Sequence, residues 1–400
     1  MIVHTRPKER MIEMKGTVRK RGNSWYYRID LAKQNGERHQ IERYAGKTYD
    51  EALRTMRRVI SQYEQTGQFK EPSKMSVHDY FDFWFKNYVQ KNLSANTQRS
   101  YINILRRYVY PILGEYEMSK VTPAIVQKAI DEISENASYT VSGKPLAKQT
   151  REIILMVIKS GFAQAVHPWQ IIEVSPAQYV RLPRQKNPKR TREDLKIISL
   201  HQFAKIKDYI PAGHPFYMPL MISFYTGMRR GEVCGLEWQQ VDLDEQSIKI
   251  NQQMIQLTKD DIRITKLKTP TSYRTIEIGD GLTAILTAQK KRQIKNREKY
   301  GNLYYESDFV CTKENGKPVT PNSVKYYCSL IQNKLGFPFS FHSLRHTHAT
   351  LLLEAGATPK EVQVRLGHSK ITTTLDTYVH LSRTKKKATA SLFDRVVNGD

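Results

Sequence analysis

The C-terminal half of this 400-residue chain contains side chains that could cut and rejoin a phosphodiester. That reaction needs a nucleophile, positive charge near the non-bridging oxygens and a proton for the leaving oxygen. Arginine suits the second task, because its planar fork donates two hydrogen bonds to phosphate and keeps its charge. Residues of the required types follow one another as Arg229, Lys268, His342, Arg345, His368 and Tyr378.

Each of these residues, taken alone, also has an ordinary structural explanation. Arg229 and Glu232 are i, i+3 neighbours where a turn leads into a helix, so they could form a surface ion pair. Residues 262–278 are predicted to form a β-hairpin with Lys268 at its bend, and a lysine in a turn is usually solvated. A tyrosine among apolar neighbours, such as Tyr378, is usually a core residue with a satisfied hydroxyl.

Taken together, the ordered motifs resemble the tyrosine recombinase (integrase) family. The stretch 226–236 contains Thr-Gly-Met-Arg-Arg-Gly-Glu, residues 341–350 contain His-x-x-Arg, and Leu-Gly-His ends at His368, ten residues before Tyr378. Every signature position of the family is filled in order. The resemblance therefore implies a DNA strand-exchange enzyme, which explains all of these motifs at once.

The resemblance implies that Arg229 and Arg345 clamp the scissile phosphate from two different helices. His342 lies three residues before Arg345, hence on the same helix face, and is expected to bind the phosphate and assist proton transfer.

The family assigns the hairpin lysine as the general acid. Lys268 is preferred to Lys266, because Lys-Thr-x-x-Ser-x-Arg from Lys268 to Arg274 matches the family's hairpin.

Three further roles are implied by the same resemblance. His368 would complete the phosphate contacts, and Glu232 would be a supporting carboxylate that orients its neighbours. Tyr378 would attack and become linked to the 3′ phosphate. Because the bond energy is then stored in the protein, no ATP, metal or other cofactor is expected for religation.

Several neighbouring residues leave alternatives open. Arg230 adjoins Arg229, His346 and His348 follow the motif histidine, and His380 follows the tyrosine. The register of the motifs favours the residues named above. His342 and His346 at i, i+4 could instead mimic a zinc pair, but no metalloprotease-type Glu follows the first histidine, and Arg345 would place a cation beside the metal.

Three other functions remain as rivals. Thr358-Pro-Lys-Glu361 is typical of a capping box with Pro at N1, and Gly367 of the residue past a helix end, so a helix–turn–helix regulator could occupy residues 358–378. Such a regulator, or an inactive relative, would bind DNA without forming a phosphotyrosyl bond. A type IB-like enzyme would relax supercoiled DNA at arbitrary sites.

The composition agrees with a DNA partner. The net charge is +25, with 64 Lys and Arg against 39 Asp and Glu, while 39% hydrophobic residues exclude a disordered polycation. A high net charge is also compatible with RNA or an acidic membrane surface. The longest apolar run, residues 153–158, is far too short for a membrane span, and three cysteines without CxxC spacing fit reduced thiols.

Proline-containing polar stretches near residues 67–74 and 182–192 divide the chain into three predicted domains, each with an excess of Lys and Arg. The fold class expected is multidomain α+β. Residues 1–72 alternate apolar and polar positions around Trp25, as in a small sheet, and then show the spacing of one helix. Tyr26 and Arg28 would lie on the free sheet face, where they could meet nucleic acid.

The second domain, residues 73–183, is predicted to be a helical bundle, with helices near 95–109, 122–135 and 147–166. The aromatic stripe of residues 77–85 has helical spacing and is expected in its core. Arg99 and Arg106 would lie outside that core. Residues 184–400 are then a mainly α catalytic domain with a small β-sheet and a C-terminal tail.

This domain order resembles integrases of Gram-positive conjugative transposons and temperate phages. The resemblance implies that the N-terminal sheet, three-stranded in that family, reads arm-type sites, while the other two domains clamp the core site on double-stranded DNA. Lys186, Arg190 and Arg192 of the linker would contact phosphates. It further implies a homotetramer on DNA holding a Holliday junction, an excision or directionality factor as a further partner, and a cytoplasmic, nucleoid-associated location without a membrane partner.

Overall fold

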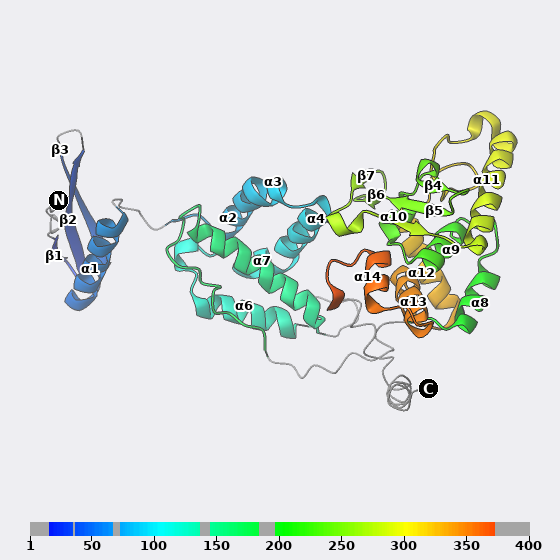
Figure 1. The fold of residues 1–400 in the computed structure, drawn as a ribbon. Coiled ribbons are helices and arrows are strands. Elements are labelled where there is room, and N and C mark those ends of the chain that lie inside the picture. Colours follow the sequence, from blue (N-terminus) through cyan, green and yellow to red (C-terminus); the bar gives the residue numbers. More distant parts are fainter. Residues whose placement is uncertain (1–15, 35–36, 67–72, 137–144, 184–196, 373–400) are drawn as a thin grey trace, which may run out of the picture. The chain divides into compact units, whose positions relative to one another are not determined.

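The computed structural model describes residues 16–34, 37–66, 73–136, 145–183 and 197–372. The chain divides into two compact units, Met1–Pro183 and Arg184–Asp400 (Figure 1). Antiparallel sheets are small and helices predominate, which confirms the predicted fold class. Within these ranges no helix is both long and apolar enough to cross a membrane.

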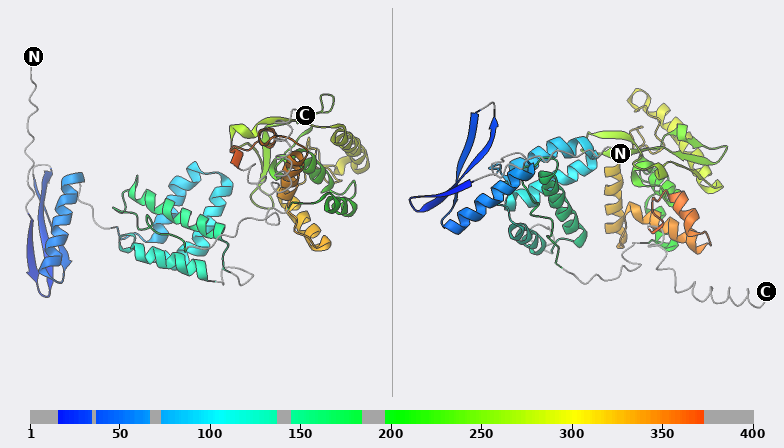
Figure 2. Two further views of the ribbon diagram at one scale, coloured as in Figure 1. Left: turned by 60° about the horizontal axis from the view of Figure 1, so that its bottom comes forward. Right: turned by 60° about the vertical axis from the view of Figure 1, so that its left-hand side comes forward.

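The first unit begins with a three-stranded antiparallel sheet in the order β1-β2-β3. One helix covers one face of this sheet (Figure 2). Tyr27 and Ile29 of the middle strand pack with Met56 of that helix. Thr48 and Glu51 cap that helix reciprocally. The elements are β1 (Gly16–Arg21), β2 (Ser24–Gln34), β3 (Glu37–Gly46) and α1 (Tyr49–Thr66).

A helical bundle forms the rest of the first unit, and it confirms the three helices predicted between residues 95 and 166. Its core contains the aromatic stripe, so this prediction also holds: Tyr80, Phe81 and Trp84 are fully buried. A Cβ at Gly161 would lie 2.2 Å from the Phe81 ring, so the glycine allows this close packing. The elements are α2 (Val77–Trp84), η1 (Phe85–Val89), α3 (Gln90–Asn92), α4 (Ala95–Ile104), η2 (Leu105–Val109), α5 (Tyr110–Leu113), η3 (Met118–Lys120), α6 (Pro123–Glu135) and α7 (Lys148–Val166).

The second unit is a mainly helical domain built on one large apolar core. The hydrophobic helix α9 runs through this core, and α13 packs against it. The helices are α8 (Leu200–Tyr209), α9 (Tyr217–Thr226), α10 (Arg230–Cys234), η5 (Trp238–Gln240), η6 (Pro270–Ser272), α11 (Asp280–Tyr300), η7 (Gly301–Leu303), α12 (Pro321–Leu335), α13 (Phe341–Glu354) and α14 (Pro359–Leu366).

Two small antiparallel sheets complete this unit, and they correct one prediction. Residues 262–278 do not form a hairpin, because β7 pairs with β6 across a local turn and β8 pairs with β5. Pro270 begins a 3₁₀ turn that separates the two strands. Lys268 therefore lies in a connection between two sheets. The strands are β4 (Val241–Asp242), β5 (Ser247–Ile250), β6 (Gln252–Gln256), β7 (Ile262–Lys266) and β8 (Arg274–Glu277).

Candidate active site

Arg229 lies at the start of α10, just after the glycine that ends α9. The helix α9 stops at Gly227, whose φ of 69° is accessible to glycine, and a Cβ there would lie 2.4 Å from Leu366. Arg229 then donates its backbone N–H to Glu232 Oε2 at 2.9 Å and its Nη1 to Oε1 at 2.8 Å. The Glu232 side chain is buried, so the contact is not the exposed ion pair that spacing alone allowed.

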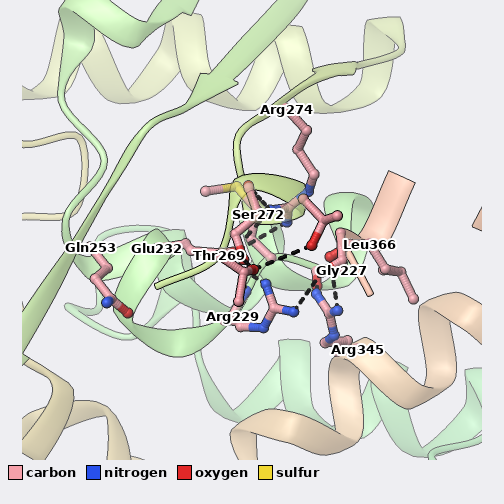
Figure 3. A network of polar contacts seen from close by, with 12 residues as sticks. Gly227, Arg229, Glu232, Gln253, Thr269, Ser272, Arg274, Arg345 and Leu366 are labelled. Carbon is pink, nitrogen blue, oxygen red and sulfur yellow. Dashed lines mark hydrogen bonds and ion pairs between the residues drawn. The ribbon is translucent and has the colours of Figure 1, made fainter. Parts of the chain in front are cut away.

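Glu232 also binds a second arginine, Arg274 of β8 (Figure 3). Burial alone would raise the pKa of Glu232, but the hydrogen bonds and charge of Arg274, followed by the charge of Arg229, hold it below its usual value. The carboxylate is therefore ionised at neutral pH. One buried anion orients two cations that arrive from different elements.

Arg345 lies on α13 and is almost fully buried. Its Nη1 donates to the carbonyl of Gly227 and its Nη2 to the carbonyl of Leu366, each at 2.8 Å (Figure 3). Arg229 Nη2 similarly donates to the carbonyl of Gly367 at 2.8 Å. Since each guanidinium has five N–H donors, both arginines keep donors for a ligand after fixing the turn that leads to His368.

Two histidines share the electrostatic environment of these arginines. Burial, the adjacent His346 and the charges of Arg345 and Arg229 lower the pKa of His342 to about 4. Burial and the same two arginine charges lower the pKa of His368 to about 3. Both imidazoles are therefore neutral at pH 7 in the DNA-free protein, and a neutral imidazole can accept a proton.

Lys268 is exposed on the connection between β7 and η6. This connection lies beside the Leu-Gly-His turn, because a Cβ on Gly367 would come within 2.9 Å of the Thr271 carbonyl and 3.2 Å of Arg274. A hydrogen bond of 2.8 Å between Thr269 and Ser272 ties the loop together. The loop therefore places an exposed lysine beside the Leu-Gly-His turn, and no described residue forms a hydrogen bond or ion pair with its side chain.

Tyr378, the predicted nucleophile, lies outside the described residues, which end at Thr372. The structure thus brings together Arg229, Glu232, Arg345, His342 and His368 in one site, with the Lys268 loop beside it.

The predicted DNA-contact residues of the first unit are also partly described. Tyr26 and Arg28 lie on the sheet face opposite α1, where Tyr26 packs edge-on against Tyr44 and Arg28 donates to Gln40. Arg99 and Arg106 are exposed on helices of the bundle. Lys186, Arg190 and Arg192 lie outside the described residues.

Sequence reasoning missed three residues that support the site. Arg274 was visible only as the end of the lysine motif. Arg365 donates from Nε to His348 Nε2 at 3.2 Å, and His348 Nδ1 lies 2.9 Å from the carbonyl of Phe224. This arrangement makes Nδ1 the donor, and it joins the last turn of α14 to α13 and α9. No spacing in the sequence indicates these contacts.

The alternatives for the other cations and for metals can now be compared with the structure. Arg230 lines a pocket together with His342. The rings of His342 and His346 are edge-to-face with centroids 4.5 Å apart. Across the described ranges, no group of three or more His, Cys, Asp or Glu residues could hold a metal ion. All three cysteines are buried and form no disulfide.

Comparison with protein families gives two matches. Residues 196–385 match the Phage integrase family, and residues 76–134 match the phage integrase N-terminal SAM-like domain. Together they span about half of the helical bundle and most of the second unit.

Curated relatives carry similar names. The chain is 26% identical over 386 residues to a tyrosine recombinase XerC-like protein of Caldanaerobacter subterraneus, covering 92% of this chain and 96% of the relative. It is 26% identical to the ICEBs1 integrase of Bacillus subtilis, covering 62% and 66% of the two chains. It is 32% identical to transposase A of transposon Tn554 from Staphylococcus aureus, covering 50% and 53%.

Solved structures share the fold. The Tn1549 transposon integrase in complex with transposon right end DNA aligns with a TM-score of 0.61 at 22% identity, covering 80% of this chain and 99% of that one. A lambda integrase tetramer bound to a Holliday junction aligns with a TM-score of 0.53 at 16% identity, covering 92% and 96%.

Proposed function

The chain belongs to the phage integrase family of tyrosine recombinases, and we propose that it is a site-specific DNA recombinase that integrates and excises a mobile genetic element. One observation carries the assignment of the active site. Arg229, Arg345 and two neutral histidines converge from separate segments onto one site, where both arginines keep N–H donors that no described residue engages.

The arrangement supports phosphoryl transfer to a tyrosine. Arg229 and Arg345 would bind the non-bridging oxygens of the scissile phosphate and stabilise the charge that develops in the transition state. Their positions are set before DNA arrives, because Glu232 and the Gly367 carbonyl hold the guanidinium of Arg229, and two backbone carbonyls hold that of Arg345. Preorganised donors cost little reorganisation at the moment of reaction.

In this mechanism the Tyr378 hydroxyl oxygen attacks phosphorus and loses its proton to a base in the site, a role open to the neutral His342. The bond to the 5′ oxygen breaks, and Lys268 protonates that oxygen as it leaves. The DNA 3′ end is then esterified to Tyr378. Attack by another 5′ hydroxyl reverses the sequence and rejoins the strands, so each exchange conserves the number of phosphodiester bonds.

The rest of the chain would bind the DNA. Residues 1–72 are proposed to bind arm-type sites, with Tyr26 and Arg28 on the open sheet face, and residues 73–183 and 184–400 to clamp the core site. Exposed Arg99 and Arg106 suit phosphate contacts. Exchange between two duplexes would proceed through a Holliday junction in a homotetramer in the bacterial cytoplasm, and a directionality factor would bias excision.

A covalent capture experiment tests the activity. In a core-site duplex with a nick just past the cleavage position, cleavage releases a short fragment that carries the new 5′ hydroxyl. Once this fragment dissociates, religation is impossible and the covalent complex accumulates. We expect a DNA-linked protein band with the wild-type chain and none with Tyr378→Phe. Tyr273→Phe, which alters an exposed tyrosine of the same unit, serves as the control and should be captured normally. Undiminished capture with Tyr378→Phe would refute the assignment of the nucleophile.

The arm-site role has a separate test in the full chain. Arg28→Gln should weaken binding to arm DNA and reduce its salt dependence, while core-site binding should stay the same. Equal loss at both sites would contradict a dedicated arm-binding face.

A further inference from the structure

Two consecutive arginines, Arg229 and Arg230, point to different places. Arg229 contacts Glu232 and the Gly367 carbonyl within the candidate active site. Arg230 instead lines a neighbouring pocket of about 470 Å³ together with Lys325 of α12 and His342 of α13. Because His342 borders both places, the pocket opens directly beside the position proposed for the scissile phosphate.

This pocket has a net positive lining. Arg230 and Lys325 are both exposed, and neither side chain has a hydrogen bond or ion pair with another residue in the part of the chain that the structure describes. None of the residues that line the pocket is a carboxylate. The nearest acidic partner along the chain, Glu232, already binds Arg229 and Arg274. Two like charges at one pocket repel each other, so the lining favours an anionic ligand.

The pocket floor strengthens this preference. Phe339, Phe341 and Cys328 are buried there, so part of the wall has a low dielectric and screens the cations poorly. Burial raises the pKa of the Cys328 thiol to about 12, with the charge of Arg230 acting weakly in the opposite direction. The thiol is therefore neutral and does not compensate the two cations.

The remaining polar groups do not offer a pattern that reads bases. The Ser340 hydroxyl bonds the Ser343 hydroxyl at 2.9 Å, and the Ser329 hydroxyl donates to the Lys325 carbonyl at 3.3 Å. Positive charge is therefore the main property by which the pocket could bind a ligand. A backbone phosphate needs charge, whereas a base edge needs a specific set of donors and acceptors.

We propose that Arg230 and Lys325 bind a second, non-scissile phosphate of the core DNA, on the cleaved strand and within two nucleotides of the scissile one. This inference rests on the proposed recombinase function. Successive phosphates on one strand rise by about 3.4 Å along the helix axis, so a strand that places one phosphate between Arg229 and Arg345 brings the next ones near His342 and this pocket. The contact fixes the position of the strand without reading its sequence.

The proposal can be tested with DNA in which one backbone phosphate at a time is replaced by an uncharged methylphosphonate. Core half-sites that bind one protomer carry a single methylphosphonate at each position in this window. For the wild-type chain, one position should weaken binding about tenfold at moderate salt. The double variant Arg230→Gln/Lys325→Gln should bind unmodified DNA about tenfold more weakly, and its plot of log affinity against log salt should be shallower by about one.

The decisive measurement combines the double variant with DNA that carries the methylphosphonate. Methylphosphonate at the sensitive position should not weaken binding of the double variant further, because the partners of that phosphate are already gone. Lys334→Gln, an exposed lysine at the far end of α12 that does not line the pocket, should behave as wild type at every position. If every methylphosphonate weakens the double variant and the wild type equally, the proposal is wrong.

The same experiment separates this proposal from the proposed function. Covalent capture of nicked DNA at saturating protein should persist in the double variant, because Arg229, Arg345 and Tyr378 are unchanged. If the double variant is still captured but no longer responds to the methylphosphonate, the phosphate site is supported. If capture occurs but no methylphosphonate in the window weakens binding of the wild type, the phosphate site is refuted and the recombinase function stands. A double variant that binds half-sites normally but fails to assemble on full sites would show that a protein segment occupies the pocket, and would overturn the proposal.

Discussion

Arg274 and Glu232 form a buried, two-pronged ion pair between β8 and α10. Arg274 Nη2 lies 2.9 Å from Oε2, and Nη1 lies 3.3 Å from Oε1. The two side chains are 5% and 1% exposed. Because Glu232 also accepts two hydrogen bonds from Arg229, this pair links the loop that carries Lys268 to the first arginine of the candidate site.

Glu232→Gln should impair both stability and cleavage. The substitution preserves shape but leaves Arg229 and Arg274 without their shared anion, and removing one partner of a buried pair costs about 3 kcal/mol. We expect lower resistance to urea at pH 7 and a cleavage rate at least about tenfold lower. Glu245→Gln, at an exposed position, is the control. Equal stability and cleavage in the two variants would show that the carboxylate does not orient the arginines.

The pH dependence of this effect follows from the lowered pKa of Glu232. A carboxyl whose folded-state pKa lies below its unfolded value stabilises the fold above the unfolded value, near 4.5, and loses that contribution as the pH falls through the folded value. The stability difference between wild type and Glu232→Gln should therefore be full at pH 7 and shrink below about pH 4.5. A difference that grows on acidification would contradict this sign.

Arg274→Lys should retain less activity than charge conservation suggests. Arg274 binds Glu232, donates Nε to the Arg365 carbonyl at 2.8 Å and donates Nη1 to the Ser272 carbonyl at 2.9 Å. Lysine cannot reproduce this fork. We expect single-turnover cleavage to fall about tenfold in Arg274→Lys and about a hundredfold in Arg274→Ala.

A second measurement identifies Arg274 as a positioning residue. Hydrogen exchange at the amides of Gly367 and His368 should accelerate in Arg274→Ala, because the last turn of α14 loses a donor. The control Arg263→Ala removes an exposed arginine that pairs with Asp261, and it should change neither exchange nor cleavage. Unchanged exchange at the turn would refute the positioning role.

The choice of Lys268 as general acid can be tested with a modified leaving group. A 5′-bridging sulfur leaves as a thiolate, whose conjugate acid is far stronger than an alcohol, so it needs no proton. Lys268→Ala should cleave ordinary DNA at least about a hundredfold more slowly than wild type and cleave the sulfur-containing substrate nearly normally. Lys266→Ala, in β7, is the matched control. If the sulfur-containing substrate restores cleavage by Lys266→Ala and not by Lys268→Ala, Lys266 is the general acid.

The pKa values of the two site histidines should respond to DNA more strongly than that of His348. Arginine charges contribute to the low pKa values of His342, about 4, and His368, about 3. A phosphate bound between those arginines offsets their charge and should raise both pKa values. Burial and the charge of Arg365 are the main causes that lower the pKa of His348 to about 4, and Arg345 contributes less. Its nitrogens are engaged by Phe224 and Arg365, so its pKa should shift least and provides an internal reference.

Imidazole titrations by NMR, with and without core DNA bound to Tyr378→Phe, measure these shifts. A pKa shift of His348 alone, or unchanged pKa values of His342 and His368, would show that the phosphate binds elsewhere.

Much of the fold follows from local sequence patterns. Apolar residues at helical spacing predicted the bundle, since burial of that stripe decides the helix face. Thr358, Glu361 and Gly367 predicted both ends of α14, because caps satisfy backbone groups within a few residues of one another.

Contacts between distant segments were not predictable in the same way. The pairing of β7 was assigned wrongly, because a strand pattern does not specify its partner, and the polar residues of β6 hid that partner. Glu232 was predicted to be a supporting carboxylate, and in the structure it contacts Arg229. Its second cation, Arg274, is 42 residues away, and only the tertiary fold brings the two together.

The nucleophile is the central claim, and mass spectrometry of the captured complex tests it most directly. Digestion with trypsin after Lys370 and Arg383 releases residues 371–383, a peptide with a single tyrosine, Tyr378. After nuclease treatment we predict that this peptide carries the mass of a 3′-linked nucleotide on Tyr378. A nucleotide on any other residue, or an unmodified peptide from a protein that has cut its DNA, would contradict the account.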